Sequence, residues 1–317
     1  LQGLKNLNVL VIGDAIVDEY HYVEPLGQSS KGANLAVKFG SKEQFAGGSL
    51  AVANHLAGFV EKVTVVAGLG KQNSHEEFIR SKLLKNVSPQ FFYFQDAPTV
   101  VKRRYVDADL AKLFEVYYYN DHPSPKEIDP QVCSWIGKNT AEFDVVIVPD
   151  FGNGFISTNM IHKICERARF LAVNTQVNSG NRGYHSINRY PRADFVSLNG
   201  PELRIATHNR HDPIEALAKT LLEQLGAGHF AVTLGSEGAL LLNQNPGATY
   251  KTPILSTQVR DRIGAGDTFL SLAGLCLGGG LDSDVALFAG SAAAALDVQV
   301  VCNREPVVPV NLYKYIS

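Results

Sequence analysis

Residues 261–269 read DRIGAGDTF and lead directly into an apolar stretch, LSLAGLCLGGGL, at 270–281. Small residues leave the backbone N–H groups of Gly264, Ala265 and Gly266 unobstructed, and a helix that starts there adds the positive end of its dipole. The segment therefore predicts a seat for a phosphoryl group, with Asp267 as a first-turn carboxylate that the dipole keeps ionised and that can accept a proton. Alone it is a weak signal, because the same residues also suit an ordinary helix cap.

Short, apolar, β-branched runs recur along the rest of the chain, and helical patterns separate them. We expect strands at 8–12, 63–67, 144–148, 170–174, 194–198 and 229–234. We expect helices at 49–60, 74–84, 158–168, 213–225, 267–277 and 282–297. This alternation predicts an α/β fold, a doubly wound and mostly parallel sheet flanked by helices. Several strands end in Gly, Asp or Asn, at the edge where such sheets bind ligands.

Two stretches, at 18–46 and at about 91–119, break this alternation. Both show period-2 patterns rich in aromatic and β-branched residues, such as TVVKRRYV at 99–106. They predict a small antiparallel β lid on a single domain that spans residues 1–317. One face of the lid would cover the site, and the other is a candidate homodimer face.

Composition restricts the partners of the protein. Among its 317 residues, 29 Lys and Arg balance 31 Asp and Glu, and no basic cluster marks a surface for nucleic acid or an anionic membrane. The longest apolar stretch, 269–281, is well short of the roughly 20 residues that a membrane helix needs. With no signal-peptide pattern and four cysteines far apart, we expect a cytoplasmic protein with free thiols. The chain begins with Leu1, so we expect an initiator or a longer segment to have been removed.

Four motifs follow one another along the chain: GDAIVDEY at 13–20, FAGGSLAVANHLAGF at 45–59, NGPE at 199–202 and DRIGAGDTF. Their combination, from residue 9 to about residue 305, resembles the ribokinase-like (PfkB) carbohydrate kinases. GDAIVDEYHYV at 13–23, APTVVKRRYV at 97–106 and VPDFGNGF at 148–155 resemble the heptose 7-phosphate kinase domain of ADP-heptose synthesis. The resemblance implies ATP-dependent phosphoryl transfer to a hydroxyl of a sugar or sugar phosphate. One candidate acceptor is a heptose phosphate in surface-polysaccharide precursor synthesis.

The resemblance assigns the catalytic groups to the glycine-rich turn. Asp267 would be the general base that takes the proton of the attacking sugar hydroxyl. Gly264, Ala265 and Gly266 would donate backbone N–H groups to the transferring phosphoryl group.

Acceptor binding is assigned to the region after the first strand. Asp18 matches the sugar-binding acid of the family, and Asp14 lies beside it, since a carboxylate can accept hydrogen bonds from two neighbouring hydroxyls. Gly47 and Gly48 would let the backbone approach the sugar closely. The alternatives are a capped turn at Asp14 and a hinge between lid and core at the glycine pair.

Two cations on the predicted lid are further candidates for acceptor binding. Lys102 and Arg104 lie two residues apart on one strand and therefore share a face. Two positive charges would suit a sugar that already carries a phosphate. The alternative is a pair of solvated charges on an edge strand.

Nucleotide binding is assigned to two other turns. Asn199 and Glu202 match the N-x-x-E motif of the family, and Glu202 would position the Mg²⁺ of MgATP through water. Thr233, Gly235 and Gly238 resemble the turn on the nucleotide side. The alternatives are a cap on a short helix for the first pair and an ordinary hairpin turn for the second group.

A monovalent cation is the last ligand that the resemblance suggests. Asp261, at the start of the glycine-rich segment, would help to hold it beside the phosphoryl seat. The expected cofactors are therefore ATP and Mg²⁺, with a monovalent cation as a further candidate.

Four positions depart from the heptose-kinase pattern. Ala51 replaces an asparagine, Asn153 a lysine, Gln176 the lysine of a D-P-K run, and Ile263 a threonine. Three of these changes remove charge or hydrogen bonds from the sugar side. A neutral sugar, or a sugar phosphate held by the lid cations alone, fits this chain better than heptose 7-phosphate does.

Two other functions stay open at this point. One is a catalytically weak, nucleotide- or sugar-binding module of a larger biosynthetic protein, which the lost polar groups favour. The other is a nucleoside kinase, for which the lid residues Tyr20, Tyr22 and Tyr105 would line the acceptor pocket. The nine histidines have no metal-ligand spacing and no G-x-S-x-G motif occurs, so neither zinc chemistry nor a serine hydrolase has support.

Overall fold

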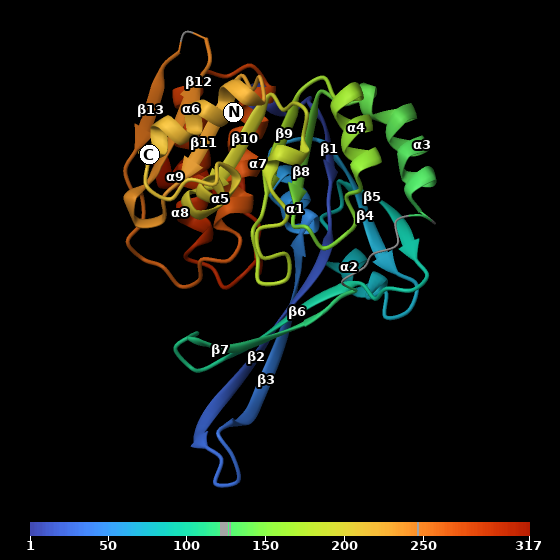
Figure 1. Ribbon diagram of the computed structural model, residues 1–317, viewed down its shortest axis with the longest axis vertical. Coiled ribbons are helices and arrows are strands. Elements are labelled where there is room, and N and C mark those ends of the chain that lie inside the picture. Colours follow the sequence, from blue (N-terminus) through green and yellow to red (C-terminus); the bar gives the residue numbers. More distant parts are fainter. Residues whose placement is uncertain (121–125, 127, 246) are drawn as a thin grey trace.

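The computed structural model describes residues 1–120, 126, 128–245 and 247–317, which form two sheets and the helices around them (Figure 1). The larger sheet has the strand order β13-β12-β11-β10-β9-β8-β1-β4-β5. Its strands are β1 (Asn8–Ile12), β4 (Lys62–Gly70), β5 (Val87–Phe94), β8 (Val145–Asp150), β9 (Leu171–Thr175), β10 (Phe195–Asn199), β11 (His229–Thr233), β12 (Ala239–Asn243) and β13 (Thr249–Thr252). All neighbours from β5 to β11 are parallel, and β12 and β13 are antiparallel.

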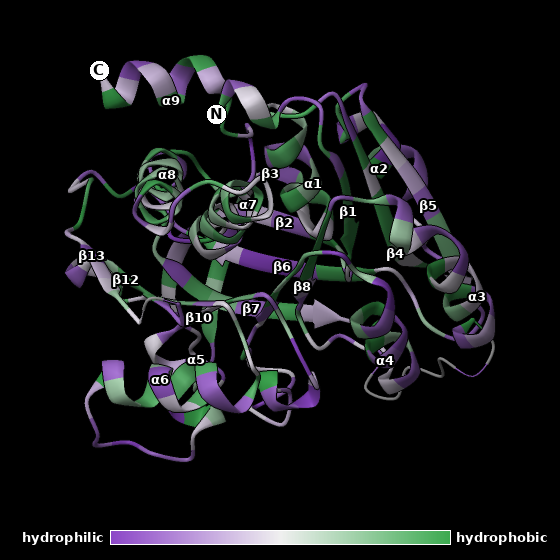
Figure 2. Ribbon diagram, turned by 90° about the horizontal axis from the view of Figure 1, so that it is seen from above, coloured by the Kyte–Doolittle hydropathy of each residue, from purple (hydrophilic) through white to green (hydrophobic). Residues whose placement is uncertain are grey.

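Helices cover both faces of this sheet (Figure 2). One face carries α1 (Ser49–Ala57), α2 (Glu76–Lys82), α7 (Ala265–Gly278) and α8 (Ser283–Asp297), with α9 (Pro309–Ile316) outside α8. The other carries α3 (Asp129–Asn139), α4 (Thr158–Arg167), α5 (Gly200–Ala206) and α6 (Ile214–Gln224). Val9 and Val11 of β1 join the first hydrophobic core, and Leu10 and Ile12 join the second. A strand buried on both faces is apolar throughout, which explains the continuous runs in the sequence.

The predicted strands and helices of the core are all present, and the doubly wound, mostly parallel sheet is confirmed. Their ends differ by a few residues; α7, for example, begins at Ala265 and not at Asp267. Helices α3, α5 and α9 and strands β5, β12 and β13 are additional. Short 3-10 turns lie at Gln2–Leu4, Thr140–Glu142, Ile187–Arg189 and Gly235–Glu237.

The smaller sheet forms the predicted lid, an arm that projects from the body (Figure 1). Its strands are β2 (Ala15–Gln28), β3 (Leu35–Gly48), β6 (Val100–Val106) and β7 (Lys112–Tyr118), in the order β3-β2-β6-β7. The β2–β3 and β6–β7 pairs are antiparallel, whereas β2 and β6 are parallel.

The second lid segment begins at Val100, so the predicted start at about Phe91 is wrong. Residues up to Phe94 belong to β5, which pairs with β4 in the core sheet, and the Phe91 side chain is buried in the core. An edge strand of the core and a strand of the lid share the same period-2 pattern, so alternation alone cannot separate them.

The thiols agree with the prediction. Cys133, Cys165, Cys276 and Cys302 are all free, and all but Cys133 are buried. In the part of the chain that the structure describes, every helix is too short or too polar to cross a lipid bilayer.

Candidate active site

Polar residues end the parallel strands along one edge of the large sheet. Asp150 ends β8 and pairs in register with Thr175 at the end of β9. Asn199 ends β10 and pairs with Thr233 at the end of β11. Asp14 follows β1, directly before the lid strand β2. The lid therefore rises beside Asp14 and Asp150, while Asn199 and Thr233 lie at the other end of the row.

Helix α7 brings the glycine-rich turn to the middle of this row, because it packs on β8, β9 and β10. The helix begins at Ala265, so the N–H groups of Ala265, Gly266 and Asp267 have no acceptor within it. A methyl group added at Gly266 would meet nothing within 4 Å. The turn thus presents unpaired donors and the positive helix end to open space.

Gly264 is the residue that makes this turn possible. Its φ of 98° lies in the left-handed region, and a side chain there would come within 2.7 Å of Asn303 Oδ1 and 2.9 Å of Asp297 Oδ2. Only glycine fits this backbone conformation and this close approach.

Asp267 is 7% exposed, and its carboxyl group feels the charges of Asp18 in the lid and of Glu202 at the start of α5. Burial raises its pKa to about 7; the charges of Asp18 and Glu202 raise it further, and Lys102 opposes them. The sequence predicted that the helix dipole keeps Asp267 ionised; with its pKa raised to about 7 by burial, the carboxyl group is only about half ionised at neutral pH. A carboxyl group with a pKa near 7 is well suited to accept a proton.

Asp18 lies inside the lid and is buried. One of its oxygens accepts a 2.5 Å hydrogen bond from Nη1 of Arg104. A Cβ at Gly47 would come within 1.9 Å of the other oxygen. Gly47 thus makes room for the Asp18 carboxylate, a role that the sequence did not reveal. Gly48 has a φ of 62° and precedes α1, where a Cβ would meet the Asp14 carbonyl oxygen at 2.5 Å.

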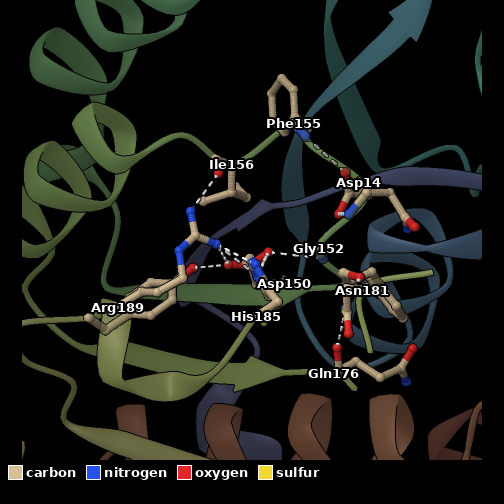
Figure 3. A network of polar contacts seen from close by, with 12 residues as sticks. Asp14, Asp150, Gly152, Phe155, Ile156, Gln176, Asn181, His185 and Arg189 are labelled. Carbon is tan, nitrogen blue, oxygen red and sulfur yellow. Dashed lines mark hydrogen bonds and ion pairs between the residues drawn. The ribbon is translucent and has the colours of Figure 1, made fainter. Parts of the chain in front are cut away.

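Asp14 holds the loop that follows β8 (Figure 3). Its two oxygens accept hydrogen bonds from the backbone N–H groups of Asn153, at 3.3 Å, and Phe155, at 3.1 Å. Burial, and then the charge of Asp150, raise the pKa of Asp14 to about 6. The capped-turn alternative therefore describes these contacts. Each Asp14 oxygen accepts one of these two hydrogen bonds and has a second lone pair that could accept another.

Lys102 and Arg104 are only 5% and 6% exposed. They lie on β6, between β2 and β7, so the alternative of solvated charges on an edge strand is wrong. The Lys102 ammonium lies 5.6 Å from the ring centre of Tyr117 and 5.5 Å from that of Phe151. Burial lowers its pKa, whereas Asp18 and other carboxylates raise it.

The Arg104 guanidinium is already paired twice. Besides the bond to Asp18, its Nε donates to Glu115 on β7 at 3.1 Å. Burial disfavours its charge, but the carboxylate of Asp18 raises the pKa of Arg104 above its usual range. Both cations thus share the inner face of the lid, and Arg104 contributes little free charge to it.

A polar network around Asp150 was missed by the sequence analysis (Figure 3). Oδ1 of Asp150 lies 2.6 Å from His185 Nε2, and Oδ2 accepts a 2.7 Å hydrogen bond from the Tyr190 hydroxyl. Arg189 lies 3.5 Å from the same Oδ2. The position of Asp150 at a strand end was a detectable signal, whereas the segment that carries His185 and Arg189 shows no regular pattern.

Asn199 and Glu202 form a capping box at the start of α5, which confirms that alternative. Asn199 Oδ1 accepts from the Glu202 N–H at 2.8 Å, and Glu202 Oε2 accepts from the Asn199 N–H at 2.9 Å. The Val177 N–H donates to Oε1. Burial raises the pKa of Glu202 to about 7. The Glu202 carboxyl group thus accepts from two backbone N–H groups and also contacts the Asn174 side chain. A carboxyl group at this edge is the type of ligand that can hold a water of Mg²⁺.

The turn that contains Gly235 and Gly238 joins the antiparallel strands β11 and β12. Both glycines have positive φ, 61° and 88°, and the Leu234 N–H donates to the Gly238 carbonyl at 2.8 Å. The hairpin-turn alternative is confirmed. The turn nevertheless lies beside the capping box, because Thr233 and Asn199 are register partners.

Asp261 ties the lid to the glycine-rich turn. Its Oδ2 accepts from the Tyr20 hydroxyl at 2.5 Å and from the Cys302 N–H. Its Oδ1 accepts from the Ile263 N–H and lies 3.6 Å from the ammonium group of Lys112. Four donors thus surround this carboxylate, which is a poor fit for a monovalent cation.

Other oxygen atoms beside the turn are better placed for a cation. Both carboxylate oxygens of Asp297 and Oδ1 of Asn303 are buried and have no hydrogen-bond partner within the described residues. Asn303 Oδ1 and Asp297 Oδ2 face Gly264, and Asp297 Oδ1 lies 3.8 Å from His55 Nε2.

A buried histidine on α1, His55, contacts Thr268 of α7 and was not identified by the sequence analysis. His55 Nδ1 accepts a hydrogen bond from the Val307 N–H, so its proton is on Nε2, which lies 3.1 Å from the Thr268 hydroxyl. Burial lowers the pKa of His55 to about 4 and keeps it neutral. The residue next to Asp267 is thereby held against α1.

Comparison with known proteins gives one family. The pfkB family carbohydrate kinase profile matches residues 6–309. The bifunctional protein HldE of Pelobacter propionicus is 24% identical over 317 residues, which are 98% of this chain and 64% of that protein. HldE of Trichlorobacter lovleyi is 25% identical, with the same coverage. The chain thus spans about 64% of the length of these relatives.

Solved structures of ribokinases share the fold. The ribokinase of Thermotoga maritima gives a TM-score of 0.73 at 17% identity and covers 98% of this chain and 99% of its own. Arabidopsis thaliana ribokinase, solved with ribose and ATP, gives 0.72 at 18%, with coverage of 98% and 99%. Escherichia coli phosphofructokinase-2, solved with potassium, gives 0.73 at 16%, with 98% of both chains covered. The fold is therefore ribokinase-like.

Proposed function

This chain belongs to the pfkB family of carbohydrate kinases, and we propose on that basis that it transfers the γ-phosphoryl group of ATP to a hydroxyl of a sugar or sugar phosphate. The observation that carries this proposal is the position of Asp267. Its carboxyl group has a pKa raised to about 7 and stands at the start of α7, among unpaired N–H donors that face open space.

In the proposed reaction, ionised Asp267 accepts the proton of the attacking hydroxyl. The hydroxyl oxygen forms a bond to the γ-phosphorus, the bond between that phosphorus and the β,γ-bridging oxygen breaks, and ADP leaves with the bond electrons. The N–H groups of Gly264, Ala265 and Gly266 stabilise the charge on the transferring group.

The acceptor is proposed to bind between the lid and the core. Asp18 would accept hydrogen bonds from sugar hydroxyls, with Asp14 nearby, and Gly47 and Gly48 shape the floor of the site. Lys102 and Arg104 border the same space from the inner face of the lid. The side chains of Asp14, Asp18, Lys102 and Arg104 are all buried. Burying a charged group costs free energy, so this burial supports a specific role for the four side chains.

ATP is proposed to bind at the other end of the row, near Asn199, Glu202, Thr233, Gly235 and Gly238. Glu202 would orient a water of the Mg²⁺ that accompanies ATP, since Mg²⁺ keeps several of its waters in proteins. A monovalent cation is proposed at the back of the glycine-rich turn. Asp261, assigned from the resemblance, borders that place, whereas the oxygen atoms of Asp297 and Asn303 Oδ1 accept no hydrogen bond that is recorded among the described residues.

A heptose phosphate is one candidate acceptor, supported by the similarity to the HldE relatives and by the resemblance of the stretches at 13–23, 97–106 and 148–155 to heptose 7-phosphate kinases. The matched profile and the intact Asp267 favour an active kinase over a catalytically weak binding module. A nucleoside kinase is less favoured, because the Tyr20 hydroxyl is bound to Asp261 and its ring is buried.

A second copy of the chain is proposed to pack on the outer face of the lid. Phe39 is 57% exposed there, and Tyr105 stacks on Phe114 with a centroid distance of 4.3 Å. His21 lies against both Phe39 and Tyr105. A partly exposed aromatic cluster on a projecting sheet is typical of a protein interface.

The test is ADP release from MgATP, measured over a panel of pentoses, hexoses, heptoses, their phosphates and nucleosides. We expect turnover with at least one sugar or sugar phosphate. ATP binding without turnover on any acceptor would contradict the proposed function and favour the binding module. Turnover on nucleosides alone would identify the third candidate.

A further inference from the structure

The cations near the acceptor side are already neutralised by the protein itself. Arg104 spans two carboxylates, Asp18 at 2.5 Å and Glu115 at 3.1 Å. Arg304, at the base of the lid, lies 2.5 Å from Glu43. A guanidinium group held between two carboxylates has few N–H groups left for a phosphate, and the group of three side chains carries a net negative charge.

The Asp150 network has no free cation either. His185 and Arg189 both contact Asp150, and their side chains point at this carboxylate in the close-up view (Figure 3). A phosphate here would compete with a buried carboxylate that already has its partners.

Lys102 is the remaining buried cation on the inner face of the lid. Asp18, Asp14 and Asp267 favour its charge, and the neighbouring Arg104 opposes it. Because Arg104 is itself paired with Asp18 and Glu115, two cations face four carboxyl groups here, and the space carries no net positive charge. A phosphate dianion that entered this space would lose its hydration and meet no unbalanced positive charge.

Asn153 adds a donor that suits a hydroxyl. Its Nδ2 is buried and lacks a hydrogen-bond partner among the described residues. Asn153 and Asp14 both line a small cavity of about 10 Å³, which is large enough for one hydroxyl group. An amide donor beside a carboxylate acceptor matches a hydroxyl group, which accepts one hydrogen bond and donates another. A phosphate dianion has no proton to donate and would be repelled by Asp14.

We infer that the acceptor is a neutral sugar or polyol, which enters the site without a phosphate group and binds through its hydroxyls to Asp14, Asp18 and Asn153. The inference rests on the proposed function and narrows its acceptor class. It places this chain apart from an enzyme for a heptose phosphate, although the sequence motifs resemble that class.

The experiment compares matched pairs of acceptors: ribose and ribose 5-phosphate, mannose and mannose 6-phosphate, and a heptose and its 7-phosphate. The readout is kcat/KM for ADP release at constant ionic strength. For the pair that contains the best acceptor, we expect the neutral sugar to be preferred by about 10²-fold or more, as a buried charge without a partner is strongly disfavoured.

A charge-adding variant tests the cause of this preference. Asn153→Lys places a cation beside the acceptor, so it should raise kcat/KM for the phosphorylated sugars by about tenfold relative to their neutral partners. Asn311→Lys, the same substitution on the exposed face of α9, is the matched control and should leave the ratio unchanged. Circular dichroism verifies that both variants fold.

The outcomes separate the two proposals. An equal rate for both members of a pair, or a preference for the phosphorylated member, would overturn the inference and leave the proposed kinase function intact. ATP binding without turnover on any sugar would overturn both proposals.

Discussion

At the scale of single residues, the proposed chemistry depends on the protonation of Asp267. A general base must be ionised, and the pKa of Asp267 is raised to about 7. We therefore expect kcat/KM for the acceptor to rise with pH up to about 7 and then to level off. A pH–rate profile under saturating MgATP tests this. A flat profile between about pH 5 and pH 8 would show that Asp267 does not act as the titrating base.

The same pKa shift predicts a stability cost. The folded state binds a proton at Asp267 more tightly than the unfolded chain, whose ordinary value is 3.8, so the stability contributed by this group falls as pH rises from about 4 to about 7. Asp267→Asn has no charge to bury. At pH 8 its free energy of unfolding, measured by urea denaturation, should exceed that of the wild type by about 1–4 kcal/mol, and at pH 4 the difference should be small.

The matched control for that measurement is Asp109→Asn, a change in an exposed residue of the lid turn. It should leave the pH dependence of unfolding as it is in the wild type. An equal gain in stability at pH 4 and pH 8 for Asp267→Asn would contradict the assigned shift.

At the scale of elements, variants of the capping box can distinguish a role of Asn199 in stability from a role in metal binding. Asn199→Ala removes the cap of α5 and should lower the free energy of unfolding by about 1 kcal/mol, whereas Asn199→Ser keeps a capping oxygen and should lose less. Urea denaturation of both variants checks this. If Asn199 also positions the metal, both variants will need more Mg²⁺ for half-maximal rate; an unchanged requirement would restrict the residue to its capping role.

The contact between β2 and β3 gives a second prediction at this scale. A Cβ at Gly47 would fall 1.9 Å from an Asp18 oxygen, so Gly47→Ala must displace that carboxylate. We expect the KM for the acceptor to rise by about tenfold or more, with the KM for ATP nearly unchanged. Gly137→Ala, in α3 where a Cβ meets nothing within 4 Å, is the control and should keep both constants. An unchanged acceptor KM in Gly47→Ala would remove Asp18 from the acceptor site.

The elements also show how far the sequence could lead. Apolar runs located the core strands, because strands buried on both faces are apolar throughout. The buried pairs could not be read in the same way: Arg104 meets Asp18 and Glu115 only through the register of β6 with β2 and β7. The sequence predicted two free cations. In the structure Arg104 is paired with Asp18 and Glu115, and the Lys102 ammonium is influenced by several carboxyl groups. The capping box was visible as a spacing, but its hydrogen bonds were not.

At the scale of the whole molecule, the outer face of the lid exposes the aromatic side chains of Phe39 and Phe114 to solvent. If a second copy packs there, Phe39→Glu combined with Phe114→Glu should convert a dimer to a monomer in analytical ultracentrifugation. A buried charge at an apolar contact opposes association. Val310→Glu, at an exposed apolar position of α9, is the control and should not change the mass. A wild-type protein that sediments as a monomer at micromolar concentration would contradict the lid interface.

The whole molecule also explains why phosphate recognition and a nearly neutral charge coexist. Under the proposed function, positive potential for ATP would come from backbone N–H groups and the helix end at Gly264 to Gly266, while Arg104 of the lid is paired with Asp18. In this proposal the phosphoryl seat is built from backbone, and it is separate from an acceptor space in which carboxylates outnumber cations.

The central claim is that Asp267 is the base of a sugar kinase, and single-turnover release of ADP with the best acceptor tests it most directly. Asp267→Asn keeps the shape of the side chain and removes the base, so the rate should fall by roughly 10²–10⁴-fold while ATP binding, measured by calorimetry, stays close to that of the wild type. An Asp267→Asn enzyme that transfers phosphate at the wild-type rate would contradict the account.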